Sequence, residues 1–309
     1  MENQISSRVS RACPVCGSRD AVVFIEENID EAKLSAFTYS SRKVPEFMCH
    51  LLVRCMSCDL VYASEPPELS YLSAAYADAA YDSGEEARCA AQSYARALAP
   101  HIEQLPGRNA AVDVGAGCGP LLPWLKQCKF GPVIGIEPSK AAIQAAPEDV
   151  RGLLREGVFS KDILDGVSPS LICSFMTLEH LPNPGQFVKT AYELLEPGGM
   201  IAIVVHNWRG LLNRLLGRRS PIIDIEHLQL FNPNSVATLL RLSGFKMIRV
   251  QCISNSYPLR YWLRLTPLPS KLKAVLGHGL EKLALADKHI KLNVGNILAI
   301  GIKDVSRHA

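Results

Sequence analysis

The chain has 309 residues, of which 48% are hydrophobic, and its 33 lysines and arginines against 30 acidic residues give a net charge of +3. This composition suits one sizeable α/β domain with a small appendage. The small charge and the lack of a basic tail give little reason to expect nucleic acid as the main partner. The sequence shows neither a signal peptide nor an apolar stretch of membrane-spanning length, so we expect a cytoplasmic protein without a transmembrane segment.

Residues 1–64 are predicted to form a small zinc-binding module. Ten cysteines in a reducing compartment are not expected to be a disulfide framework, so their spacing indicates metal binding or catalysis. Two Cys-x-x-Cys pairs supply the four thiolates of a closed tetrahedral site, which leaves no open position on the metal. We therefore expect zinc to stabilise the fold and to take no part in catalysis; the alternative is a chance pairing of cysteines. The predicted ligands are Cys13, Cys16, Cys55 and Cys58.

Residues 65–108 begin with Glu-Pro-Pro and then become rich in alanine and tyrosine, which predicts a helical connector that covers the next domain as a lid. Short apolar runs then alternate with helical stretches over residues 109–309, which is typical of parallel strands joined by crossover helices. An insertion at 254–292 is predicted to be largely amphipathic helix. The predicted strands are 110–114, 133–136, 171–175, 200–205, 246–253 and 296–302.

The strongest motif is the sequence VDVGAGCG at residues 112–119, an apolar strand that runs through alternating glycines into a helix. Glycines let the backbone approach a ligand closely, and about twenty residues on a second strand ends in a carboxylate suited to ribose hydroxyls. A nicotinamide dinucleotide is one candidate ligand, and S-adenosylmethionine (SAM) is the other. An acidic residue two positions before the first glycine favours SAM, because it would attract the methionine amino group and repel a pyrophosphate. The predicted cofactor-binding residues are Asp113, Gly115, Gly117, Gly119 and Glu137.

Two later segments follow this motif in order, LEHLPNP at 178–184 and LLEPGG at 194–199. Over about residues 75–250 the chain resembles the class I SAM-dependent methyltransferases. This resemblance implies a Rossmann-like α/β sheet with helices on both faces, preceded here by the zinc-binding module. It also implies that Asp162, near the end of the third strand, approaches the adenine of the cofactor.

Three histidines lie near predicted strand ends, where ligands bind in open α/β sheets: His180, His206 and His227. Methyl transfer from a sulfonium requires an aligned nucleophile and, for a hydroxyl or an acidic carbon, removal of a proton, which suits histidine. His227 is the preferred candidate, with a structural role beside the following helix as the alternative. His180 is the second candidate for a catalytic role, with anchoring of its loop by the adjacent Glu179 as the alternative function of this segment. His206 ranks lowest.

The segment Glu226-His227-Leu-x-x-Phe, together with the cysteine pairs, resembles the zinc-containing nucleotide-sugar C-methyltransferases. The resemblance implies that Glu226 orients a general base, His227, and that aromatic residues such as Tyr76 and Tyr81 cover the cofactor, with plain helix packing as the alternative for the tyrosines. The chain departs from that family in carrying Asp224 where a tyrosine precedes the pair, and it holds no large second α/β domain within its 309 residues.

Residues 209–219 and 261–276 mix apolar and cationic side chains at helical spacing. They predict either a lid that accepts a hydrophobic or anionic substrate and contacts a membrane surface, or a solvated basic face. The main hypothesis is O- or C-methylation of a small acceptor, a saccharide or another natural-product intermediate. The alternatives are an RNA methyltransferase guided by the zinc module, which the balanced charge of residues 9–64 disfavours, and a non-catalytic scaffold that binds the cofactor. The sequence leaves the oligomeric state open.

Overall fold

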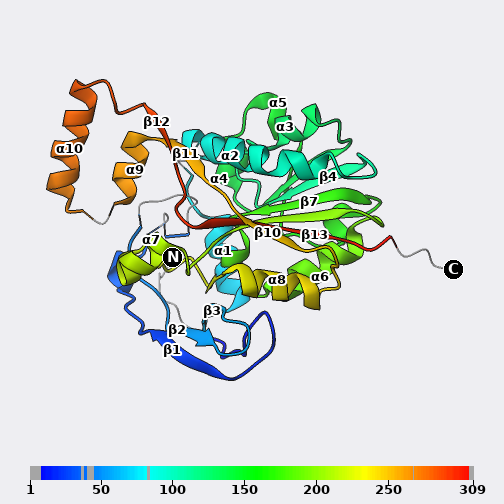
Figure 1. The fold of residues 1–309 in the computed structure, drawn as a ribbon, viewed down its shortest axis with the longest axis horizontal. Helices are drawn as coiled ribbons and strands as arrows, with labels where there is room; N and C mark the ends of the chain where they lie inside the picture. Colours follow the sequence, from blue (N-terminus) through cyan, green and yellow to red (C-terminus); the bar gives the residue numbers. More distant parts are fainter. Residues whose placement is uncertain (1–7, 36–37, 40–44, 82–83, 267, 306–309) are drawn as a thin grey trace.

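A computed structural model describes residues 8–35, 38–39, 45–81, 84–266 and 268–305. Its centre is a seven-stranded sheet with the order β10-β13-β8-β7-β4-β5-β6 (Figure 1). All strands run parallel except β13, which is antiparallel to both of its neighbours. The seven strands are β4 (Ala110–Val114), β5 (Val133–Glu137), β6 (Leu154–Glu156), β7 (Pro169–Phe175), β8 (Met200–His206), β10 (Arg249–Cys252) and β13 (Asn296–Ile302).

Helices cover both faces of this sheet, because its inner strands are apolar on both sides (Figure 1). Alternate residues of β4 divide between the two layers: Val112 packs in the cluster with α6 and α8, and Ala111 packs in the cluster with α2 and α3. The predicted α/β fold with helices on both faces is therefore confirmed. The helices are α2 (Gly84–Ile102), α3 (Leu122–Gln127), α4 (Lys140–Gln144), α5 (Glu148–Arg151), α6 (Pro184–Leu194) and α8 (Pro233–Leu242).

The N-terminal region builds a second, four-stranded antiparallel sheet, whose outer strand comes from far along the chain. The short strand β9 pairs with β3, so that Val61 lies opposite Leu230. The proposed boundary at residue 64 therefore passes between strands of one sheet, and the module packs into the same core as the central sheet. This sheet comprises β1 (Ala21–Ile25), β2 (Leu52–Cys55), β3 (Val61–Ala63) and β9 (Gln229–Leu230).

The insertion before β13 is only partly helical. It opens and closes with an antiparallel strand pair, β11 (Asn255–Pro258) and β12 (His289–Leu292), which holds α9 (Leu259–Leu265) and α10 (Ser270–Lys282). The remaining helical segments are α1 (Leu69–Ala77), α7 (Leu211–Leu216) and the 3₁₀ turns Glu31–Lys33, Asp162–Leu164, Leu178–His180 and Gly217–Arg219. Within the described ranges no helix has the length and apolar character needed to cross a bilayer.

Candidate active site

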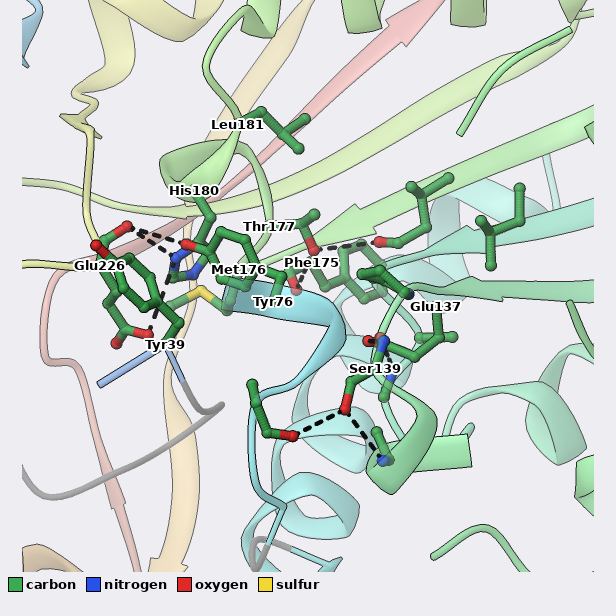
Figure 2. Close-up of a pocket in the computed structure, with 18 of the residues that line it drawn as sticks. Tyr39, Tyr76, Glu137, Ser139, Phe175, Met176, Thr177, His180, Leu181 and Glu226 are labelled. Atoms are coloured by element: carbon green, nitrogen blue, oxygen red, sulfur yellow. Dashed lines mark hydrogen bonds and ion pairs between the residues drawn. The ribbon is translucent and has the colours of Figure 1, made fainter. Parts of the chain in front are cut away.

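One cavity of about 570 Å³ lies at the carboxyl ends of the central strands. This volume falls in the range of about 300–1,000 Å³ that is usual for small-molecule and cofactor sites. Segments that follow β4, β5, β7 and β8 line its floor, which is the edge where parallel sheets bind ligands. Residues of α1 and α9 line it from the other side. Of these two helices, α1 belongs to the connector that was predicted to act as a lid. Figure 2 shows the polar region of the cavity.

The glycine-rich turn forms one end of the cavity. Gly115, Gly117 and Gly119 all adopt positive φ angles of 75°, 56° and 73°. A Cβ atom on Gly115 would overlap the hydroxyl of Thr177, so glycine lets the turn pass close to the loop after β7. Gly119 differs from the other two, because it does not line the cavity. A Cβ atom on Gly119 would lie only 2.6 Å from Val150 Cγ1. Its role is therefore in packing.

Two buried carboxyl groups, Asp113 and Glu137, lie at the same end of the cavity. Glu137 accepts two backbone hydrogen bonds of 2.8 Å, from the N–H groups of Gly117 and Ser139 (Figure 2). Burial raises the pKa of Glu137, although these bonds oppose the rise. Burial, with a contribution from the charge of Glu137, raises the pKa of Asp113 to about 8. A cationic or hydroxyl-bearing ligand would stabilise the ionised form of this pair.

Three histidines meet at the other end of the cavity. The ring centroid of His227 lies 5.0 Å from that of His180 and 5.3 Å from that of His206, and all three rings line the cavity. The sequence separates these histidines widely, and the ends of β7 and β8 together with the loop before β9 bring them together. His206, the lowest-ranked candidate of the three, therefore belongs to the same cluster.

Each of these histidines has its Nδ1 atom beside a fixed acceptor. His227 Nδ1 lies 3.0 Å from the Ile222 carbonyl, and His180 Nδ1 lies 3.1 Å from the Glu226 carbonyl. A carbonyl oxygen can only accept, so the neutral rings carry their proton on Nδ1 and keep Nε2 as the basic nitrogen. The other neutral tautomer, with the proton on Nε2, would place the Nδ1 lone pair against a lone pair of the carbonyl oxygen.

The same assignment holds for His206, through a chain of two asparagines. Asn296 Nδ2 donates to Asn255 Oδ1 over 2.9 Å, which turns Asn296 Oδ1 toward His206 Nδ1 at 3.0 Å. Both asparagines are buried. Buried amides with satisfied partners hold one orientation, so this pair fixes the His206 ring.

The Glu226 carboxylate lies between two of the histidines. Its Oε1 is 3.9 Å from His227 Nε2. Its Oε2 is 4.0 Å from His180 Nδ1, and Figure 2 shows these two side chains. The backbone carbonyl of Glu226 accepts a hydrogen bond of 3.3 Å from the Tyr76 hydroxyl. Burial raises the pKa of Tyr76 well above its usual value, so this phenol remains a neutral donor. A carboxylate at this distance stabilises the protonated form of a histidine.

Asp224, two residues before Glu226, anchors the N-terminal module. Its carboxylate accepts a hydrogen bond of 2.8 Å from the Glu46 backbone N–H. Glu179 has a comparable structural function, since it is fully buried and accepts a 2.7 Å bond from the His206 backbone N–H. Burial raises the pKa of Glu179 to about 8. Glu179 therefore anchors its loop, as the alternative assignment proposed, while the neighbouring His180 faces the cavity.

The expected contact of Asp162 with the cofactor needs correction. Asp162 is exposed on its 3₁₀ turn and is not among the cavity-lining residues, whereas Val158 and Phe159, just after β6, are. Sequence reasoning also missed Thr177 and Ser139 at the cavity wall. Ser139 had a visible signal, because a serine just before a helical stretch is a typical helix N-cap, and it caps α4 here.

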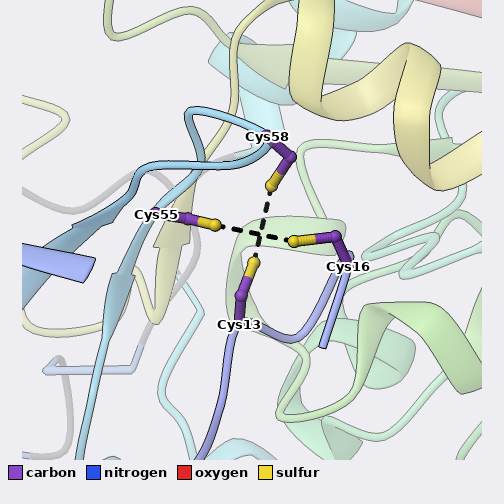
Figure 3. A group of neighbouring side chains, drawn as sticks. All are labelled: Cys13, Cys16, Cys55 and Cys58. Carbon is purple, nitrogen blue, oxygen red and sulfur yellow. Dashed lines mark hydrogen bonds between the residues drawn. The ribbon is translucent and has the colours of Figure 1, made fainter. Parts of the chain in front are cut away.

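The four predicted metal ligands converge beside the N-terminal sheet, two from the turn before β1 and two from the end of β2 and the turn after it (Figure 3). Their sulfur atoms all lie within 4.8 Å of one another, and the pairs Cys13–Cys58 and Cys16–Cys55 are each 3.5 Å apart. Thiolates at about 2.3 Å from zinc would be about 3.8 Å apart in a regular tetrahedron. The residues therefore fit a structural zinc ion. In the part of the chain that the structure describes, no other group of cysteine, histidine and acidic side chains has metal-binding geometry.

The strand order with its single antiparallel strand, the glycine turn and the acid at the end of β5 define a class I SAM-dependent methyltransferase fold. The family model described as a methyltransferase domain matches residues 84–250, which is more than half of the chain. The chain belongs to this family and is a SAM-dependent methyltransferase.

Solved structures of similar fold are distant in sequence. A SAM-dependent methyltransferase from Thermotoga maritima, titled a possible histamine N-methyltransferase, is 19% identical over 71% of this chain and 91% of that one, with a TM-score of 0.47. A SAM-dependent methyltransferase from Archaeoglobus fulgidus is 16% identical over 69% and 94%, also with a TM-score of 0.47. The YcgJ protein from Bacillus subtilis is 16% identical over 68% and 98%, with the same score. A search of curated proteins found no match.

Proposed function

We propose that this protein methylates a hydroxyl or an acidic carbon of a small acceptor, a saccharide or a related natural-product intermediate, with His227 as the general base. One observation carries this proposal: a single cavity holds the buried carboxyl pair at one end and the histidine cluster at the other. A cofactor at the first end and an acceptor at the second would share one space. Proximity of this kind is what a direct displacement requires.

The cofactor end fits SAM by its charge. SAM, when bound, supplies the methyl group. We assign Asp113 to the methionine ammonium and Glu137 to the ribose hydroxyls, with the backbone of Gly115 and Gly117 against the ligand. Two buried carboxyls suit a ligand that carries a cation and two hydroxyls, since such a ligand would offset part of the cost of burying them.

At the acceptor end, Nε2 of His227 would take the proton from the attacking hydroxyl or carbon, and Glu226 would stabilise the imidazolium that forms. Nε2 of His180 and of His206 would accept hydrogen bonds from further hydroxyls of the acceptor. Three basic ring nitrogens around one space support a polyhydroxylated acceptor over an apolar one. Proton transfer and methyl transfer then occur on the same acceptor atom.

The direct experiment incubates the protein with methyl-labelled SAM and an extract of the source organism, and identifies the labelled product. We expect the label in a small molecule that resists ribonuclease. Label in ribonuclease-sensitive material would instead support the RNA methyltransferase alternative. Calorimetry with SAM alone comes first, because failure to bind at hundreds of micromolar would remove the basis of the proposal.

SAM affinity is expected to increase with pH between about 6 and about 8, by up to about tenfold per unit. The pKa of Asp113 is raised to about 8, so the folded protein holds a proton that the unfolded chain loses near pH 4. Without ligand, the free energy of unfolding should therefore fall as pH rises through this window. Binding of the SAM ammonium should release the proton from the Asp113 carboxyl. Calorimetry in buffers of different ionisation enthalpy measures that release. Asp113→Asn should bind weakly, without the pH slope.

Gly115→Ala is expected to weaken SAM binding at least about tenfold, because the new methyl group combines a positive φ with overlap on Thr177. Gly166→Ala is the matched control, since its φ of 71° is equally unfavourable for alanine but no atom lies within 4 Å of the added Cβ. Both variants should lose the stability that a positive φ costs alanine, and Gly115→Ala should lose more in thermal unfolding because of the overlap. Equal SAM affinity in the two variants would contradict the assigned role of the turn.

A further inference from the structure

Positive charge is concentrated in two segments whose cations have no role in the proposed function. Residues 259–292 contain seven lysines and arginines against two acids, and residues 209–219 contain four arginines and no acid. The remainder of the chain has 22 cations and 28 acids, a net charge of −6. The mild average charge of the protein therefore conceals two basic segments on an acidic body.

These segments also expose apolar side chains. Helix α10 has no buried residue along its 13 positions and projects beyond the rest of the molecule (Figure 1). It packs on α9, where Lys273 donates to the Arg264 carbonyl and Gly277 faces Leu263. A different stripe of α10 remains exposed, at the i, i+3, i+4 and i+11 spacing of one helix face. Its members are Leu272, Val275, Leu276 and Leu283.

Lysines flank that apolar stripe, since Lys271 and Lys282 fall along one edge of it at helical spacing. Within the described residues neither lysine makes an ion pair, while Arg209, Arg260 and Arg264 are paired with acids. Leu211 and Leu215 of α7 are similarly exposed, at 73% and 75%, next to Arg214 and Arg218. The side chain of Asn213 ties α7 to Val294, two residues after β12, and both basic segments lie on the same side of the molecule (Figure 1).

We propose that α10 and α7 form a docking surface for an anionic lipid membrane, with the apolar stripe in the interface and the lysines at the headgroups. An apolar face bordered by cations is the arrangement of an interfacial helix. Nucleic acid would also attract the cations, but it offers no site for four exposed aliphatic side chains. This docking does not depend on the identity of the acceptor.

Vesicle co-sedimentation of the full chain tests the proposal. We expect binding to vesicles that contain phosphatidylglycerol, little binding to pure phosphatidylcholine, and loss of binding at high salt. The double variant Lys271→Gln/Lys282→Gln should bind anionic vesicles about thirtyfold less. Each lysine near the surface contributes about 1 kcal/mol, and about 1.4 kcal/mol corresponds to a tenfold change in the partition coefficient. The matched control is Lys126→Gln/Lys189→Gln, two exposed lysines on α3 and α6, which should bind as the parent does.

A second variant, Val275→Ser/Leu276→Ser, removes apolar area and leaves the charge unchanged, and it should also reduce binding. Circular dichroism checks that the variants are folded, and because none of these residues lines the cavity, SAM affinity should stay unchanged. Three results would overturn the proposal: no binding to anionic vesicles, equal losses in the control pair, or retention of an RNA oligonucleotide in place of vesicles. A dimer that the apolar variant dissociates would overturn it too, because a second copy would then cover the stripe.

Discussion

Replacing His227 by alanine is expected to lower methyl transfer by roughly 10²–10⁴-fold, the usual contribution of a general base, while SAM binding is retained. His227 lies at the acceptor end of the cavity, with its Nδ1 proton held by the Ile222 carbonyl and Glu226 beside Nε2. The carboxyl pair that we assign to the cofactor lies at the opposite end. The measurement compares labelled product from extract with SAM affinity from calorimetry.

His227→Asn separates the base from the bracing role. An asparagine amide can still donate to the Ile222 carbonyl, so this variant should keep the loop in place but should lack a basic nitrogen. We expect His227→Asn to be as inactive as His227→Ala and to melt nearer the parent temperature. If His227→Asn were active, His227 would have only the structural role that was its alternative assignment.

Removal of the metal is expected to unfold the N-terminal sheet and to abolish activity through loss of structure. Apparent binding energies of structural zinc are about 10–16 kcal/mol, which is similar to the whole stability of a typical domain, about 5–15 kcal/mol. Cys13, Cys55 and Cys58 are buried within the main core cluster of the molecule. The unfolding temperature should therefore fall markedly with a strong chelator and in Cys55→Ser.

Elemental analysis should give one zinc per chain, which Cys55→Ser should lose. Cys252→Ser is the matched control, since Cys252 is exposed on β10 and lies outside the cluster. It should retain both metal and unfolding temperature. Full stability after complete removal of zinc would show that the four thiols pack well enough without an ion.

The central sheet was predictable because most of its strands are continuous apolar runs, which are typical of strands buried on both faces. Strand β6 has the sequence Leu-Arg-Glu and is mostly exposed at the sheet edge, so its pattern gives no such signal. The missed edge strand also explains the error at Asp162, because the residues that reach the cavity directly follow β6. Edge strands are set by pairing, which a local pattern does not reveal.

The cysteine cluster and the glycine turn were predictable because each depends on spacing within a few residues. The meeting of the three histidines was predictable only in part, since it depends on where crossovers place the ends of β7 and β8. Strand β9 has two residues, too few for any periodic pattern. The shared sheet, and with it the true extent of the N-terminal module, could therefore be found only in three dimensions.

The pairing of β9 with β3 decides which parts of this enzyme can be exchanged as a unit. Glu226 and His227 lie directly before β9, and Asp224 accepts hydrogen bonds from the N-terminal module. A chimaera that imports residues 221–230 of a relative without its N-terminal sheet would leave a strand edge and a buried carboxylate without partners. The unit of recombination is thus discontinuous, and it joins strands β1, β2 and β3 to the segment that holds Glu226 and His227.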